Sequence, residues 1–166
     1  MIALKNMYNT IRLSDWKYSF MPLIVGWIYL SILLLKIEIC LQLFFTGVLY
    51  MISSSGFAAL GFFINNYFDI EFDKNSGKTN SLSAISGIAK FKTFLLIVFL
   101  AFAPWIWLPS NHISWGLMFL EIILFLIYSI PSIRLKETWF LAGIIDAGYA
   151  YLIPFLLCYY TFYLFS

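Results

Sequence analysis

Five long apolar runs dominate this chain and restrict it to very few folds. Each run is long enough, or nearly so, to cross a hydrocarbon core of about 30 Å, which takes about 20 helical residues. The runs lack the alternation of apolar and polar residues that is typical of a half-buried strand, so helices are expected. Composition agrees, because 63% of the 166 residues are hydrophobic and only 11% are charged. We therefore predict an all-α integral membrane protein, a single membrane domain over residues 1–166 that forms a bundle of about five transmembrane helices. The predicted spans are residues 20–35, 39–64, 94–108, 115–130 and 139–165.

The basic residues predict how this bundle is oriented. Nine of the ten basic residues precede the first span or follow the second or fourth span, and only Lys36 falls on the other side. Cytoplasmic loops of membrane proteins carry an excess of Lys and Arg. We therefore expect a multi-pass protein whose N-terminus and motif loop, residues 65–92, are cytoplasmic. The net charge of only +2 gives no indication of a nucleic-acid partner.

Several residues inside the spans carry predictions about packing. The small residues 53–56, Ser-Ser-Ser-Gly, predict a close approach of two helices. Trp105 is expected at the membrane interface, where Trp is enriched. Glu121 and Asp146 are acids within spans, and such residues are functional candidates by default. No catalytic role is assigned to either, and for Asp146, flanked by glycines, we expect a hydrogen bond between helices.

The most informative polar stretch follows the second apolar run and reads Asn-Asn-Tyr-Phe-Asp-Ile-Glu-Phe-Asp over residues 65–73. Asn65, Asp69 and Asp73 are spaced by four, which places them on one face of a helix over two turns. Acids often cap the polar end of a membrane helix, but here they follow its C-terminus, where the macrodipole disfavours negative charge. A bound cation explains them better. Mg²⁺ usually takes one or two carboxylates together with water and phosphate oxygens, so we predict that these three residues bind Mg²⁺.

This stretch resembles the first aspartate-rich motif of the UbiA family of membrane prenyltransferases, although Asn66 stands where the family commonly has Asp. Residues 74–80, which continue from it, are similar to the family's loop with a basic residue after the motif. Residues 128–136, Tyr-Ser-Ile-Pro-Ser-Ile-Arg-Leu-Lys, are similar to a family segment of Tyr, Ser, Pro, Arg and Lys after the fourth helix. A weaker match is residues 12–16, just before the first span. The matches occur in the family's order, which makes them more specific together than singly.

The resemblance implies Mg²⁺-dependent transfer of a polyprenyl group from an isoprenoid diphosphate to a lipophilic acceptor, which is an aromatic compound, a quinone precursor or a lipid. Asn65, Asp69 and Asp73 would form the catalytic centre, with Mg²⁺ holding the diphosphate among membrane lipids. The substrate-binding residues that the resemblance implies are Lys78, Tyr128, Arg134, Lys136 and Arg12. The competing interpretation is that basic residues belong in cytoplasmic loops anyway, and that Arg12 is an interfacial anchor.

The resemblance covers the N-terminal half of the family's length. The family has two related halves that each contribute an aspartate motif, and after Asp73 the only further Asp in this chain is Asp146. We favour the interpretation that the chain is a fragment of a longer enzyme, because the motifs of the first half are nearly intact. Two alternatives remain open. A second chain, or a second copy, completes the bundle, or the chain is a non-catalytic half-length membrane subunit or remnant that binds a lipid or a partner chain.

Overall fold

The computed structural model describes residues 13–166, with side chains from Tyr18 onward, and these residues form helices and no strand. Five helical stretches in this part of the chain are long and apolar enough to cross a membrane, which confirms the expected all-α, multi-pass class. They are α2 (Leu13–Leu35), α3 (Leu41–Phe68), α5 (Gly87–Phe102) continued by η1 (Ala103–Ile106), α6 (His112–Ser129), and one long stretch made of α7 (Trp139–Ala147), the π-helical η3 (Gly148–Leu152) and α8 (Ile153–Phe165). The short elements α4 (Ile70–Asn75) and η2 (Leu135–Glu137) lie in the connections.

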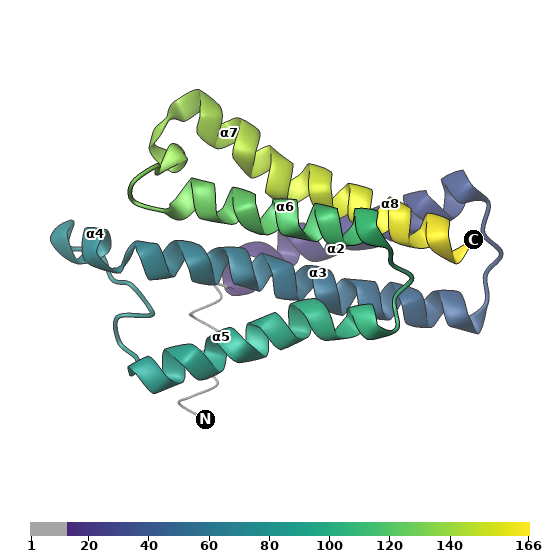
Figure 1. Ribbon diagram of the computed structural model, residues 1–166, viewed down its shortest axis with the longest axis horizontal. Helices are drawn as coiled ribbons and strands as arrows, with labels where there is room; N and C mark the ends of the chain where they lie inside the picture. Colours follow the sequence, from purple (N-terminus) through teal and green to yellow (C-terminus); the bar gives the residue numbers. More distant parts are fainter. Residues whose placement is uncertain (1–12) are drawn as a thin grey trace.

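The long helices run side by side along the long axis of the molecule, with α3 in the middle (Figure 1). α3 contacts α5 on one side and α6 and α2 on others, and α8 packs against α2 and α6. The α2–α3 connection and the C-terminus lie at one end of the bundle, whereas α4, η2 and the start of α5 lie at the opposite end (Figure 1). The second half of the chain thereby brings the α6–α7 connection next to the end of α3.

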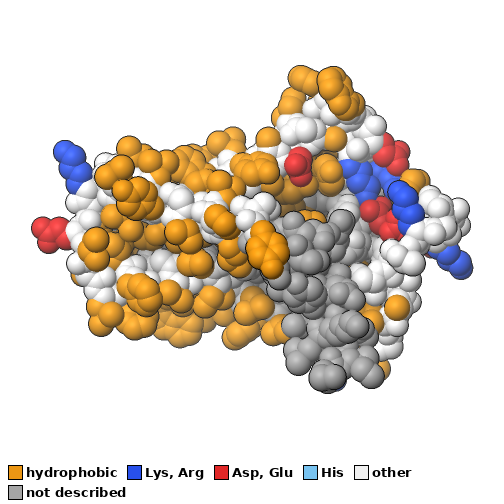
Figure 2. All heavy atoms as spheres, turned by 180° about the vertical axis from the view of Figure 1, so that it is seen from behind, with side chains coloured by type: hydrophobic (Ala, Val, Ile, Leu, Met, Phe, Trp, Pro, Cys, Tyr) orange, Lys and Arg blue, Asp and Glu red, His pale blue; other side chains and the backbone are white. Residues whose placement is uncertain are grey.

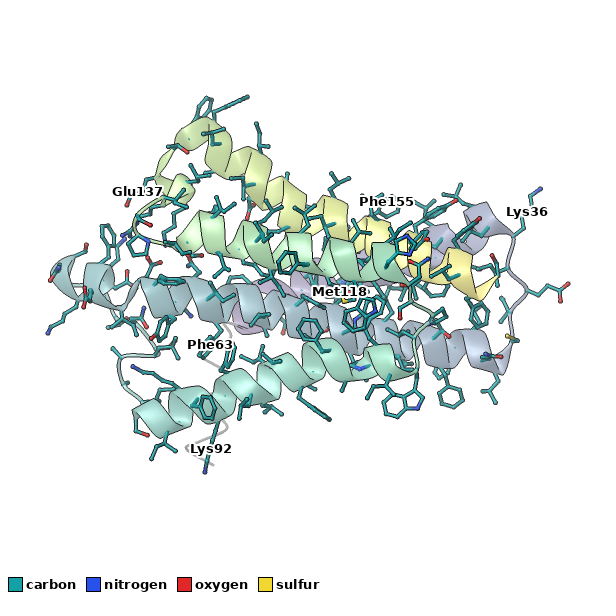
Figure 3. The ribbon with its side chains drawn as sticks, in the orientation of Figure 1. Lys36, Phe63, Lys92, Met118, Glu137 and Phe155 are labelled. Carbon is teal, nitrogen blue, oxygen red and sulfur yellow. The ribbon has the colours of Figure 1, made fainter. Side chains whose placement is uncertain are left out.

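Apolar side chains cover the body of the molecule, and charged side chains gather mainly at its two ends (Figure 2). This distribution suits a bundle surrounded by lipid, since exposed apolar surface of this extent is unusual in soluble monomers. Lys36 lies at one end, while Lys92 and Glu137 lie at the other (Figure 3). The separation of Lys36 from the other described basic residues is therefore as expected. The assignment of the basic end to the cytoplasm stays a prediction.

The expected close approach of helices at residues 53–56 occurs between α3 and α5. A Cβ atom placed on Gly56 would lie 2.4 Å from the backbone nitrogen of Ala101, so only glycine fits there. Beside it, the Ser53 hydroxyl donates to the Ala101 carbonyl at 2.7 Å and accepts from the Trp105 indole N–H at 2.7 Å. Trp105 is therefore buried between helices rather than facing outward in an interfacial belt, as was expected. The reason is that Ser53 supplies an internal partner for the indole nitrogen, which would otherwise need water.

The connection between α3 and α5 is shorter than the loop expected over residues 65–92. α3 continues to Phe68, and α4 follows after Asp69 alone. α5 begins at Gly87, seven residues before the predicted span at residue 94, because the Ser86 side chain accepts a hydrogen bond from the Ala89 backbone N–H and caps the helix. Apart from Asp69, only residues 76–86 are therefore outside helices in this connection. A shorter loop restricts where its polar side chains can lie.

The core lies where α2, α3, α6 and α8 meet and includes Ile24, Tyr50, Met118 and Phe162. The Tyr50 hydroxyl donates a hydrogen bond to the backbone carbonyl of Pro154, which ties α3 to α8. Just before this contact, η3 interrupts the α-helix with a π-helical turn. Such turns are rare in proteins overall, and those that occur are often found at functional sites.

Candidate functional site

The end of α3 presents the predicted polar residues in successive helical turns. The Asp69 backbone N–H bonds the Asn65 carbonyl at 3.1 Å, and the Asp73 N–H bonds the Asp69 carbonyl at 2.8 Å. Asp69 itself ends α3 and begins α4. Because each of these bonds joins residues four apart, the three side chains follow one another by about one turn, as the spacing predicts.

The α6–α7 connection delivers two basic side chains to this helix end. α6 ends at Ser129, and the N–H groups of Ile133 and Arg134 fold back onto the Ile130 carbonyl at 3.1 and 2.7 Å. Arg134 has a φ of 40°, in the left-handed region that side-chain-bearing residues seldom adopt. Such strain persists only where surrounding contacts hold it, and it is concentrated at functional sites.

Four residues meet there, and we call them the Asp69 cluster: Asn65, Asp69, Arg134 and Lys136. The Lys136 ammonium donates to both carboxylate oxygens of Asp69, at 2.5 and 2.6 Å, and to the Asn65 amide oxygen at 2.9 Å. The Arg134 guanidinium lies 3.2 Å from the same carboxylate. The charged side chains are only about 15% exposed, so water screens them little.

Arg134 is held from two further sides. Its guanidinium carbon lies 3.9 Å from the centre of the Phe72 ring, a cation–π contact. Its Nε lies 2.7 Å from a carboxylate oxygen of Glu137, whose side chain is 57% exposed and therefore weakly coupled. Two cations thus converge on the Asp69 carboxylate, and the exposed carboxylate of Glu137 offsets the second positive charge.

Asp73 has a different partner. It accepts a hydrogen bond from the Asn80 amide at 2.9 Å, and the same amide donates to the Asn66 carbonyl at 2.9 Å. Asn80 is buried, and its side-chain oxygen accepts from the Leu82 backbone N–H. Asn80 therefore fastens the connection to the motif. Sequence reasoning assigned it no role, although it lies in the stretch that resembles the family's loop.

A cavity of about 590 Å³ opens between α2, α3, α6 and α7–η3, and Asn65 is one of its lining residues. From α3 it is lined by residues on one face, including Ala58, Gly61 and Asn65. A Cβ on Gly61 would lie 2.8 Å from the Phe125 ring, so the absent side chain makes room for that aromatic wall. The walls are mostly apolar or aromatic, as in pockets for lipophilic molecules. The Asp69 cluster therefore adjoins this cavity through Asn65.

Tyr128, singled out from its motif position, lines the cavity. Its ring meets that of Tyr149 edge-on at 5.5 Å, and the Tyr149 hydroxyl donates to an Asp146 oxygen at 2.6 Å. Asp146 is thus bonded within its own helical stretch rather than to another helix, which corrects the expectation. The π-helical turn starts immediately after Ala147 and brings Tyr149 within reach of Asp146, three residues before it.

The side-chain oxygens of Asn65 and Asp69 are of the type that a hard cation such as Mg²⁺ prefers. No group of three or more His, Cys, Asp or Glu side chains that could hold a metal occurs among the described residues. Asn65 and Asp69 nevertheless supply three oxygens next to one another, and the Lys136 ammonium contacts all three of them. This set fits Mg²⁺, which takes few protein carboxylates and completes its shell with water and phosphate. The predicted ligand role of Asp73 stays a prediction, since its carboxylate is bonded to Asn80.

Lys78, a predicted substrate-binding residue, is not brought to the cluster. Lys78 is exposed and forms no ion pair with any described acid, so its substrate-binding role stays a prediction. Arg12 lies outside the described residues. Sequence reasoning missed Phe72 and Glu137 as neighbours of Arg134. Phe72 could have been found, because it lies within the motif and one turn after Phe68.

Comparison of this chain with models of protein families, with curated proteins and with solved structures gave no match. The site is therefore interpreted from its own geometry and from the sequence motifs.

Proposed function

We propose that the chain takes part in Mg²⁺-dependent transfer of a polyprenyl group from an isoprenoid diphosphate to a lipophilic acceptor, as its likeness to the UbiA family implies. One observation carries the proposal: a cluster of two cations and one carboxylate adjoins an apolar cavity within a membrane bundle. An isoprenoid diphosphate has the matching shape, since it joins a strongly anionic head to an apolar tail.

The Asp69 cluster offers the diphosphate group positive charge and hydrogen-bond donors in fixed directions. The Arg134 guanidinium is a planar fork that can donate to two phosphate oxygens, and its stacking on Phe72 fixes the plane of that fork. Lys136 supplies a compact charge with three donors. In the structure, Arg134 and Lys136 donate hydrogen bonds to Asp69, and Lys136 also donates one to Asn65. A diphosphate would take over some of them, and Asp69 would then be free to act as a metal ligand.

The spacing of Asn65, Asp69 and Asp73 predicts that they would hold Mg²⁺ together with phosphate oxygens, and the ion would neutralise charge on the leaving diphosphate. The chain's own residues do the rest. Arg134 and Lys136 hold the diphosphate as the bond between the allylic C1 and its oxygen breaks and the electron pair leaves with the diphosphate. The acceptor then forms a bond to C1 and loses a proton.

The cavity is suited to the apolar chain of the donor and to the positive charge that develops at C1. Its volume falls within the usual range of about 300–1,000 Å³ for ligand pockets. The rings of Phe125 and Tyr128 each meet the ring of Tyr149 edge-on, and aromatic faces stabilise a neighbouring positive charge. A wall of this kind also keeps water from a developing allylic cation.

The test is binding of a radiolabelled isoprenoid diphosphate to the chain in lipid nanodiscs, with and without Mg²⁺. Asp69→Ala and Asp73→Ala should each abolish Mg²⁺-dependent binding and leave membrane insertion intact. Glu71→Ala is the matched control, because Glu71 is an exposed acid in the same stretch and is not a proposed ligand. Binding that survives both aspartate substitutions would contradict the proposal and would favour a non-catalytic membrane subunit.

A further inference from the structure

Glu121 is a buried acid that the proposed reaction does not use. It lies within α6, its residue surface is 3% exposed, and it lines both the large cavity and a small neighbouring one beside Tyr50 and Trp105. Within the part of the chain that the structure describes, no hydrogen bond or ion pair reaches its carboxyl group. An acid in this position without a partner is costly, and intramembrane acids face cavities and pair with a ligand or with one another.

The walls around Glu121 have a consistent chemistry. Asp146 lines the same cavity and keeps one oxygen on the Tyr149 hydroxyl. No Lys, Arg or His side chain occurs among the described lining residues. Aromatic side chains make up much of the remaining wall, and they are Phe20, Phe62, Phe125, Tyr128, Tyr149 and Tyr151. Two carboxyl groups beside the rings of Phe125, Tyr128 and Tyr149, with no cation among the described lining residues, form a combination that recognises positive charge.

We propose that this cavity binds a lipophilic organic ammonium ion, whose charged nitrogen pairs with Glu121 and whose apolar part lies against the aromatic wall. A hydroxyl group in the same place would offer one hydrogen bond but no positive charge to match the two carboxyl groups. An ammonium ion satisfies the Glu121 carboxylate directly, because a charge-assisted hydrogen bond is stronger than one between neutral groups.

Glu121 lies away from the Asp69 cluster, although Asn65 lines the same cavity. Glu121 precedes Ser129, the last residue of α6, by eight residues, which is about 12 Å along a helix. The α6–α7 connection with Arg134 and Lys136 starts only after Ser129. The ammonium site therefore lies deep in the bundle, whereas the cluster lies at its charged end, and the inference does not rest on prenyl transfer.

The experiment uses the full chain in nanodiscs of zwitterionic phosphatidylcholine, without metal or diphosphate. The probes are a photoreactive long-chain alkylamine and the alcohol of the same length, and mass spectrometry locates the labelled peptides. We expect saturable labelling of the cavity walls on α3 and α6 by the amine, and an apparent affinity at least about tenfold higher for the amine than for the alcohol.

Glu121→Gln keeps the size of the side chain and removes its charge, and it should remove about that tenfold preference. Glu38→Gln is the matched control, since Glu38 is an exposed acid in the α2–α3 connection, and it should change nothing. Equal affinity for amine and alcohol in the unmodified chain, or an amine affinity that Glu121→Gln leaves unchanged, would overturn the inference. Asp69→Ala should leave amine binding intact, so a failure of this site and a failure of the proposed function are distinguishable.

Discussion

Lys136 is the side chain whose removal should weaken diphosphate binding most directly. Its ammonium group forms hydrogen bonds of 2.5, 2.6 and 2.9 Å to Asp69 and Asn65, and its side chain is 14% exposed. Lys136→Met retains most of the apolar stem and removes the charge. Among the described residues, Asp69 would then keep Arg134, at 3.2 Å, as its one cationic partner.

The size of the effect follows from the bond that is lost. A hydrogen bond to a charged group contributes about 1.5–3 kcal/mol. If Lys136 transfers one such bond from Asp69 to a phosphate oxygen, its removal should raise the Kd for an isoprenoid diphosphate about 10- to 150-fold. Low exposure keeps the value from falling to that of a surface pair, which contributes about 0–1 kcal/mol.

The assay is equilibrium binding of a radiolabelled isoprenoid diphosphate in nanodiscs with Mg²⁺ present. Lys92→Met is the matched control, because Lys92 is exposed and lies at the same end of the bundle without belonging to the cluster (Figure 3). We expect its Kd to stay close to that of the unmodified chain. If both substitutions change the Kd equally, the effect is one of overall charge at that end, and the assignment of Lys136 to the diphosphate is refuted.

Two further predictions concern packing and orientation. Gly56→Ala should destabilise the bundle by about 3 kcal/mol, since its Cβ would overlap the backbone of α5, whereas Gly116→Ala meets no atom within 4 Å and should have little effect. Thermal unfolding in detergent, followed by circular dichroism, checks this, and equal melting temperatures for the two variants would disprove the close approach. Cys40, exposed in the α2–α3 connection, should react with a membrane-impermeant maleimide added outside intact cells, while buried Cys158 should not. Labelling of Cys40 only after the membrane is opened would reverse the predicted orientation.

The transmembrane spans could be predicted because insertion depends on local apolar content, which the sequence displays directly. The start of α5 could not be predicted in this way. Lys90 and Lys92 lower the hydropathy there, but the Ser86 cap extends the helix through them. Trp105 was misplaced for a related reason, because its position near the end of an apolar run resembles that of interfacial residues. Its hydrogen-bond partner, Ser53, is 52 residues away and no local pattern indicates it.

In the candidate site, too, features set by local sequence could be predicted, and features set by contacts between distant residues could not. The turn-by-turn succession of Asn65, Asp69 and Asp73 follows from helical geometry alone. The meeting of Asp69 with Lys136 spans 67 residues, and only the resemblance to a family suggested it. The cavity and the isolation of Glu121 depend on how each helix is rotated about its own axis. That rotation is decided by packing between helices, such as the Gly61–Phe125 contact, rather than by any one run of residues.

The π-helical turn η3 also sets the angular phase between the two halves of the last span. A π-helix advances less per residue than the 100° of an α-helix, so the five residues of η3 delay the rotation of α8 relative to α7. α7 can then direct Asp146 toward the cavity while α8 directs Pro154, Leu157 and Cys158 into the core. The two halves of this span can therefore face the cavity and the core respectively, whereas an uninterrupted helix would turn one of them away.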